Sequence, residues 1–140
     1  MTTDLTVTRI AHSCPITYVI QGGDRTVWFG GDTLKIPELD TLPDRFGRFD
    51  LALFPTNGLR IRPLGGRQVV MSATEAAELA ATLRPTVAVP HHYAFTSGWL
   101  GNRQITQGER EPLRFAGAVA ALAPDTIVRV VLPGQPVRVP

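Results

Sequence analysis

The chain has 140 residues, a hydrophobic fraction of 44% and a formal net charge of +2. That length fits one domain, residues 1–140, and the small charge and missing aromatic–basic pattern argue against a nucleic-acid partner. No apolar run reaches the roughly 18 residues of a membrane span, and the N-terminus lacks a signal-peptide pattern. The single cysteine, Cys14, excludes an internal disulfide, so we expect a cytoplasmic protein without a membrane partner.

The first third of the sequence is rich in predicted strands. Leu5–Ile10 alternates apolar and polar residues, as a half-buried strand does. Two more strands, Ile16–Ile20 and Thr26–Phe29, flank the glycine turn Gln21–Asp24 and predict a hairpin.

The middle of the chain is less regular. Ile36–Phe46 is weakly helical and contains Pro37 and Pro43, so we predict only a short or broken helix there. Leu51–Phe54 is a continuous apolar run, typical of a strand that is covered on both faces. The segment Thr56–Val69, rich in Gly, Pro and Arg, is predicted to be a loop.

Helix and strand alternate in the second half. Ser72 and Glu75 form a capping-box signature, and Phe115, Val119 and Leu122 have the spacing of a buried helix face. The predicted elements are a helix over Glu75–Leu83, a strand over Thr86–Val89 that Pro90 ends, a loop over Ala94–Gln107, a helix over Arg110–Leu122 and a hairpin over Thr126–Val139. Strands followed by this alternation predict a layered α/β (α+β) domain with a mixed sheet.

Two short segments attract attention as functional candidates. The strand Thr26–Phe29 stops at Gly30-Gly31 and presents Asp32, either as a functional carboxylate at a strand end or as an ordinary helix cap. Arg60, Arg62 and Arg67 form the densest group of arginines, which could attract an anionic substrate but more simply belong to a solvated loop.

Three candidate metal ligands each follow a predicted strand: His12, Asp32 and His92. If those strands share a direction, their ends bring two imidazoles and a carboxylate to one rim of the sheet. Imidazole nitrogen and carboxylate oxygen suit zinc, and three ligands leave a fourth position for water. Any single histidine here is more often structural, so only the joint placement predicts a metal site.

The motifs that carry these residues resemble metallo-β-lactamase-fold hydrolases, in particular the ascorbate-6-phosphate lactonase-like branch. The three ligand candidates stand in the runs Ile10-Ala11-His12-Ser13, Gly31-Asp32-Thr33 and Pro90-His91-His92-Tyr93. Further matching segments, in the same order as in the family, are Phe54–Gly58, Met71–Leu79, Leu83–Pro85 and Val131–Val137.

The resemblance implies metal-dependent hydrolysis of a small-molecule substrate. It assigns His12 to a first metal, Asp32 to a bridge between two metals and His92 to the second metal, which makes Asp32 and His92 the catalytic pair. The metal is expected to be zinc, with manganese or iron as alternatives. A hydroxide between the metals would attack an ester, lactone, amide or phosphodiester.

Neighbouring residues are expected to support these ligands. Thr33 and Tyr93 are candidates for fixing the orientation of the ligands. His91 would orient its neighbours or face solvent. Cys14 is a possible further ligand, although a small buried residue is the better interpretation.

The family's first half carries an HxHxDH motif, but this chain has no histidine before His12. The resemblance therefore covers the C-terminal half of an αββα sandwich, with helices on one face of the sheet. We expect a hydrolase-like protein completed by a separate N-terminal-half polypeptide or by a second copy in a homodimer. The alternative is a non-catalytic, truncated remnant or binding module.

Overall fold

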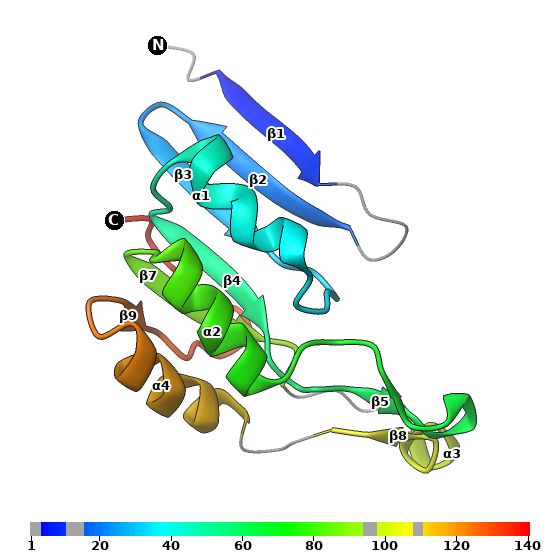
Figure 1. Cartoon of the computed structure of the whole chain (residues 1–140). Coiled ribbons are helices and arrows are strands. Elements are labelled where there is room, and N and C mark those ends of the chain that lie inside the picture. Colours follow the sequence, from blue (N-terminus) through cyan, green and yellow to red (C-terminus); the bar gives the residue numbers. More distant parts are fainter. Residues whose placement is uncertain (1–3, 11–15, 94–97, 108–110) are drawn as a thin grey trace.

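The computed structural model describes residues 4–10, 16–93, 98–107 and 111–140. Its main element is a six-stranded mixed sheet in the order β1-β2-β3-β4-β7-β9 (Figure 1). The strands are β1 (Leu5–Ile10), β2 (Thr17–Gly22), β3 (Arg25–Phe29), β4 (Leu51–Pro55), β7 (Val87–His91) and β9 (Ile127–Val128). The β1–β2 and β2–β3 pairs are antiparallel and the remaining pairs are parallel. The predicted α/β class with a mixed sheet is therefore confirmed.

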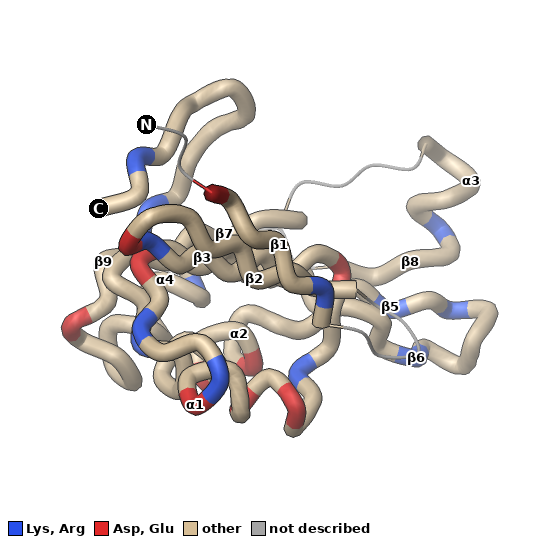
Figure 2. The backbone as a smooth tube through the Cα atoms, turned by 90° about the horizontal axis from the view of Figure 1, so that it is seen from above, with Lys and Arg blue, Asp and Glu red and all other residues tan. Residues whose placement is uncertain are grey.

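Helices cover one face of this sheet (Figure 2). They are the 3-10 helix η1 (Pro37–Thr41), α1 (Leu42–Phe46), α2 (Ala73–Leu83) and α4 (Glu111–Leu122). The core between the layers contains three aromatic rings in contact. The ring of Phe54 packs against those of Trp28 and Phe115, with centroid distances of 5.1 and 5.4 Å. All three rings are fully buried, so the helices shield this face of the sheet from solvent at the rings.

The opposite face of the sheet is only partly covered. Its central residues Leu51 and Val87 pack with Val131 and Val137 of the C-terminal segment, which lies across the sheet from α1 and α2 (Figure 2). Toward β1 the face is open, because Val7 is 54% exposed. An apolar surface of this kind is typical of a region that another structure covers.

Several local predictions are confirmed with their physical reasons. The Ser72 hydroxyl accepts a hydrogen bond from the Glu75 backbone N–H, and the Glu75 carboxylate accepts one from the Ser72 N–H, which starts α2. The helical segment predicted to be broken consists of η1 and α1. Pro37 and Pro43 lie in their first turns, where the missing N–H has no cost.

The loops predicted over 56–69 and 94–107 contain structure that the sequence did not indicate. A second sheet has the order β6-β5-β8, and α3 (Gly98–Asn102) and the 3-10 helix η2 (Arg62–Leu64) adjoin it. Its strands are β5 (Arg60–Ile61), β6 (Arg67–Gln68) and β8 (Ile105–Thr106). Strands of two residues leave no periodic pattern, so the prediction of loops was wrong here.

The predicted end of β7 at Pro90 was also wrong, because the strand continues to His91. The carbonyls of Thr86 and Ala88 accept hydrogen bonds from the N–H groups of Ile127 and Arg129, so these two residues direct their backbone groups toward β9. Because every second residue of a strand faces the same neighbour, the backbone nitrogen of Pro90 also points to the β9 side. Since β9 ends at Val128, no partner strand at that level needs an N–H from Pro90.

The C-terminal region differs from its prediction as well. Leu122 is 50% exposed rather than part of the core, whereas Phe115 and Val119 are fully buried. Past β9 the chain forms no strand up to Pro140, so the prediction of a final hairpin was wrong: this segment packs Val131 and Val137 on the sheet instead of pairing with itself. Among the helices that the structure describes, none has the length and apolar character to cross a membrane.

His91, at the end of β7, is a buried titratable group. Its ring stacks on Phe29 with centroids 5.4 Å apart, and its Nε2 has no hydrogen-bond partner among the described residues. Burial, reinforced by the nearby His92, lowers the pKa of His91 to about 4, although a hydrogen bond with the Leu53 backbone opposes the shift. The folded chain thus holds this imidazole neutral.

We expect the stability of the protein to fall as the pH drops from 6.5 toward 4. The pKa of His91 is lower in the folded chain than its ordinary value of 6.5, so the unfolded chain binds more protons in this window. The contribution is complete above pH 6.5, and about 2 kcal/mol is lost by pH 4.5. Urea unfolding at pH 7 and pH 4.5 measures it. A His91→Phe variant should lose less stability than the wild type, and an equal loss would contradict the assignment.

Candidate metal centre

Two glycines turn the chain out of the sheet immediately after β3. Gly30 N–H donates to the Leu53 carbonyl at 3.0 Å, and a Cβ on Gly30 would lie only 2.9 Å from that oxygen. Gly31 has a φ of +58°, and its Cβ would lie 2.9 Å from the carbonyl of Ile16. Side chains at these positions would collide with backbone, so only glycine allows this turn. Asp32 follows directly and emerges at the carboxyl end of β3.

Asp32 is not a helix cap. The next helix, η1, begins at Pro37, and its N-cap residue is Ile36, which makes no side-chain capping bond. The side chain of Asp32 is 62% exposed, and its Oδ1 lies 2.9 Å from Nε2 of His92. The helix-cap alternative left open by the sequence was therefore wrong.

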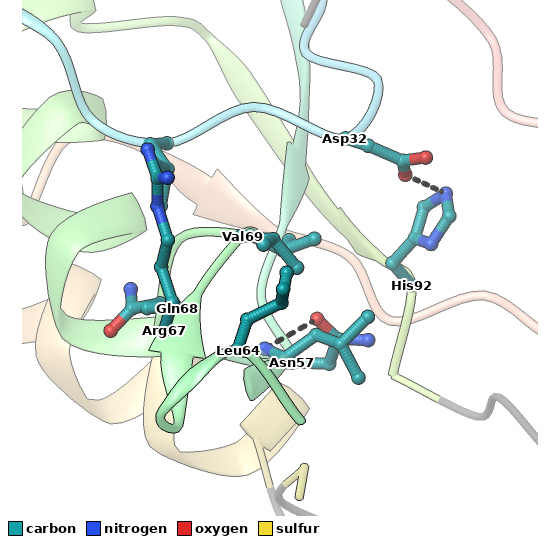
Figure 3. Close-up of a pocket in the computed structure, with 10 residues that line it drawn as sticks. Asp32, Asn57, Leu64, Arg67, Gln68, Val69 and His92 are labelled. Carbon is teal, nitrogen blue, oxygen red and sulfur yellow. Dashed lines mark hydrogen bonds and ion pairs between the residues drawn. The ribbon is translucent and has the colours of Figure 1, made fainter. Parts of the chain in front are cut away.

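His92 follows β7 with a φ of +56°. A left-handed backbone is uncommon outside glycine, and such positions gather at functional sites. Because β3 and β7 both run parallel to β4, their carboxyl ends reach the same rim of the sheet. The side chains of Asp32 and His92 turn toward each other across that rim (Figure 3).

The residues expected to support the ligands are bonded mainly to backbone. Thr33 is buried and its hydroxyl donates to the Leu34 carbonyl at 2.9 Å. Tyr93 donates its hydroxyl to the Val131 carbonyl at 2.6 Å, which ties the chain after His92 to the C-terminal segment. These bonds hold the segments that carry Asp32 and His92 rather than the two side chains themselves.

His91 lies against His92, with ring centroids 4.9 Å apart and the rings at 64°. Its Nε2 is buried, so of the two expectations for His91, facing solvent was wrong. The contact with the His92 ring limits the orientations that His92 can adopt.

His12 and Cys14 lie outside the residues that the structure describes. Within the described ranges, no three His, Cys, Asp or Glu side chains gather as a metal site. Asp32 and His92 fit a metal as a pair: their atoms are 2.9 Å apart, close to the roughly 3.4 Å between two ligand atoms in tetrahedral zinc geometry. The donor types also suit a borderline divalent ion.

Asp32 and His92 open onto a cavity of about 440 Å³ (Figure 3). This volume lies in the range of small-molecule sites, about 300–1,000 Å³. The other lining residues are Leu34, Asn57, Leu59, Leu64, Arg67, Gln68, Val69 and Val70. Sequence reasoning missed the cavity because most of its wall belongs to the segment predicted as a loop. The arginine group in that segment was the available signal.

A metal-dependent hydrolase of the UPF0173 group from Deinococcus radiodurans is 33% identical over 98 residues, covering 69% of this chain and 38% of the relative. A relative of the same description from Anaeromyxobacter sp. (strain K) is 33% identical over 124 residues, covering 88% of this chain and 38% of its own length. The chain therefore spans less than half the length of these curated relatives.

The chain also matches about half of a solved structure. Igni18, a metallo hydrolase from the archaeon Ignicoccus hospitalis, aligns with a TM-score of 0.63 and 25% identity, covering 94% of this chain and 50% of Igni18. A family model described as the beta-lactamase superfamily domain matches residues 2–93, which include Asp32 and His92. Because this match covers well over half of the chain, the chain belongs to the beta-lactamase superfamily.

Proposed function

We propose that this chain forms part of a metal-dependent hydrolase, with Asp32 and His92 holding a divalent metal ion at the rim of the sheet. The observation that carries the proposal is the 2.9 Å approach of a carboxylate oxygen and an imidazole nitrogen from two strands beside a cavity. The names of the relatives, metal-dependent hydrolases, support it.

Zinc is the proposed ion, since the nitrogen and oxygen donors suit it, with manganese or iron as alternatives. When bound, such an ion lowers the pKa of water to about 7 and so supplies a nucleophile at neutral pH. Asp32 and His92 would hold the ion beside the cavity, and His91 restrains the His92 ring. The proposed substrates are esters, lactones, amides or phosphodiesters, and the sequence motifs favour the lactonase-like branch.

Two donors are fewer than the three protein ligands of a catalytic zinc ion. We propose that His12 and a second polypeptide, either a separate N-terminal half or a second copy of this chain, complete the site. One observation supports a partner: the sheet face beside β1 exposes Leu5 and Val7. The lone Cys14 supports a cytoplasmic setting, where thiols stay reduced.

A non-catalytic binding module is the second candidate. The observation that favours it is that the described residues bring only two donors together. The two candidates predict different results for zinc binding and for association with a second chain.

Substituting either proposed ligand should weaken zinc binding. Asp32→Asn removes the carboxylate charge and His92→Gln removes the imidazole, so each should lower zinc affinity at least tenfold, about the smallest loss seen even for residues that only support ligands. Calorimetric zinc titration of the purified chain measures this. Asp44→Asn, an equal charge change at an exposed carboxylate of α1, is the control. Unchanged affinity in both ligand variants would contradict the proposed site.

A second copy, if it completes the site, should make association depend on metal. Analytical ultracentrifugation with and without zinc should show a dimer that zinc stabilises, because isologous contacts can bring two ligand sets together. Val7→Lys should shift the chain to monomer, since a buried unpaired charge is costly. Leu113→Lys, at a 72% exposed position of α4, is the control. A monomer that takes up no zinc would favour the binding module.

A further inference from the structure

The cavity beside Asp32 and His92 has an apolar middle and two polar ends. Leu64 and Val69 lie between Arg67 on one side and the Asp32–His92 pair on the other (Figure 3). The remaining apolar lining residues are Leu34, Leu59 and Val70. A ligand that fills this space therefore meets hydrocarbon along most of its length.

The neutral polar residues of the lining are already bonded within the protein. Asn57 is buried, its Nδ2 donates to Gln107 at 3.3 Å and its Oδ1 accepts from the Leu59 N–H at 3.2 Å. Gln68 donates its Nε2 to the Glu75 carboxylate at 2.6 Å. Since these amides hold the wall together, they are poor candidates for recognising a ligand.

Arg67 is different from its neighbours in the same segment. Arg60 donates to Gln68 Oε1 at 2.8 Å, and Arg62 donates to the Arg103 carbonyl at 3.2 Å. The backbone of Arg67 pairs with Ile61 in the small sheet, but its guanidinium has neither an ion pair nor a hydrogen bond to any of the residues that the structure describes. Its guanidinium is a fork of donors that matches carboxylate oxygens. An arginine with free donors at one end of an apolar cavity is suited to a ligand with an anionic end.

We propose that the cavity binds the substrate of the proposed hydrolase through an apolar body that ends in a carboxylate. The body lies against Leu64 and Val69, the carboxylate pairs with Arg67, and the bond to be cleaved lies at Asp32 and His92. This inference rests on the proposed function and narrows its substrate class to hydrophobic monoacids. Neutral polar compounds would leave the apolar wall unfilled and Arg67 unpaired.

Straight-chain carboxylates from butanoate to decanoate test the cavity without any catalysis. Calorimetric titration of the metal-free chain should show affinity rising with each added methylene, by up to about fourfold per methylene where burial is complete. Octanoate should bind more tightly than octanol, because the alcohol cannot form an ion pair with Arg67. The same titrations with zinc present show whether the carboxylates compete for the ion.

Three variants separate the two parts of the site. Arg67→Gln should reduce octanoate affinity to that of octanol, and Leu64→Asn should flatten the dependence on chain length. Leu64 is 59% exposed, so its substitution leaves the core intact. Arg45→Gln, in α1 and outside the cavity lining, is the control with the same change of net charge.

No binding of decanoate, or binding that Arg67→Gln and Leu64→Asn leave unchanged, overturns the inference. Failure of the inference and failure of the proposed function are distinguishable, because carboxylate binding is measured without metal. A chain that binds zinc but no carboxylate overturns the inference alone. A chain that binds carboxylates but no zinc keeps the ligand site and overturns the proposed hydrolase.

Discussion

The parallel pairing of β3, β4 and β7 is the constraint on which the candidate site depends. In the register of these strands, Phe29 pairs with Leu53, and Leu53 pairs with Val89. Asp32 lies three residues after Phe29, past the end of β3, and His92 lies three residues after Val89, past the end of β7. A one-residue slip of either strand would turn its side chains to the opposite face and separate the pair.

Register alone does not bring the two side chains into contact. Strands on either side of β4 lie about 9.5 Å apart, twice the usual strand spacing, so both segments must lean over the end of β4. The turn at Gly30-Gly31 directs Asp32 inward from one side. The left-handed backbone of His92 directs its ring inward from the other. Two unusual backbone turns on opposite strands therefore meet at one point, which is difficult to explain by packing alone.

The sequence predicted the features that depend on local pattern. Alternation and β-branched residues indicated β1 to β3, a continuous apolar run indicated β4, and the Ser72 capping box indicated α2. Positions after strand ends singled out Asp32 and His92. The ligand role of these two residues, and any part played by His12, stays a prediction. What local pattern missed depends on partners far away in the chain: whether Pro90 interrupts a strand is decided by where β9 ends.

The cavity wall was unpredictable for the same reason. Its strands β5 and β6 have two residues each and pair with each other, and β5 also pairs with β8. The rim that carries Asp32 and His92 is thus fixed by the main sheet, whereas the wall that carries Arg67 is fixed by strand pairing in a small, separate sheet. None of the three strands of this small sheet pairs with a described strand of the main sheet. Substrate preference can therefore vary among relatives that keep the same rim, which is why the fold by itself does not name the substrate.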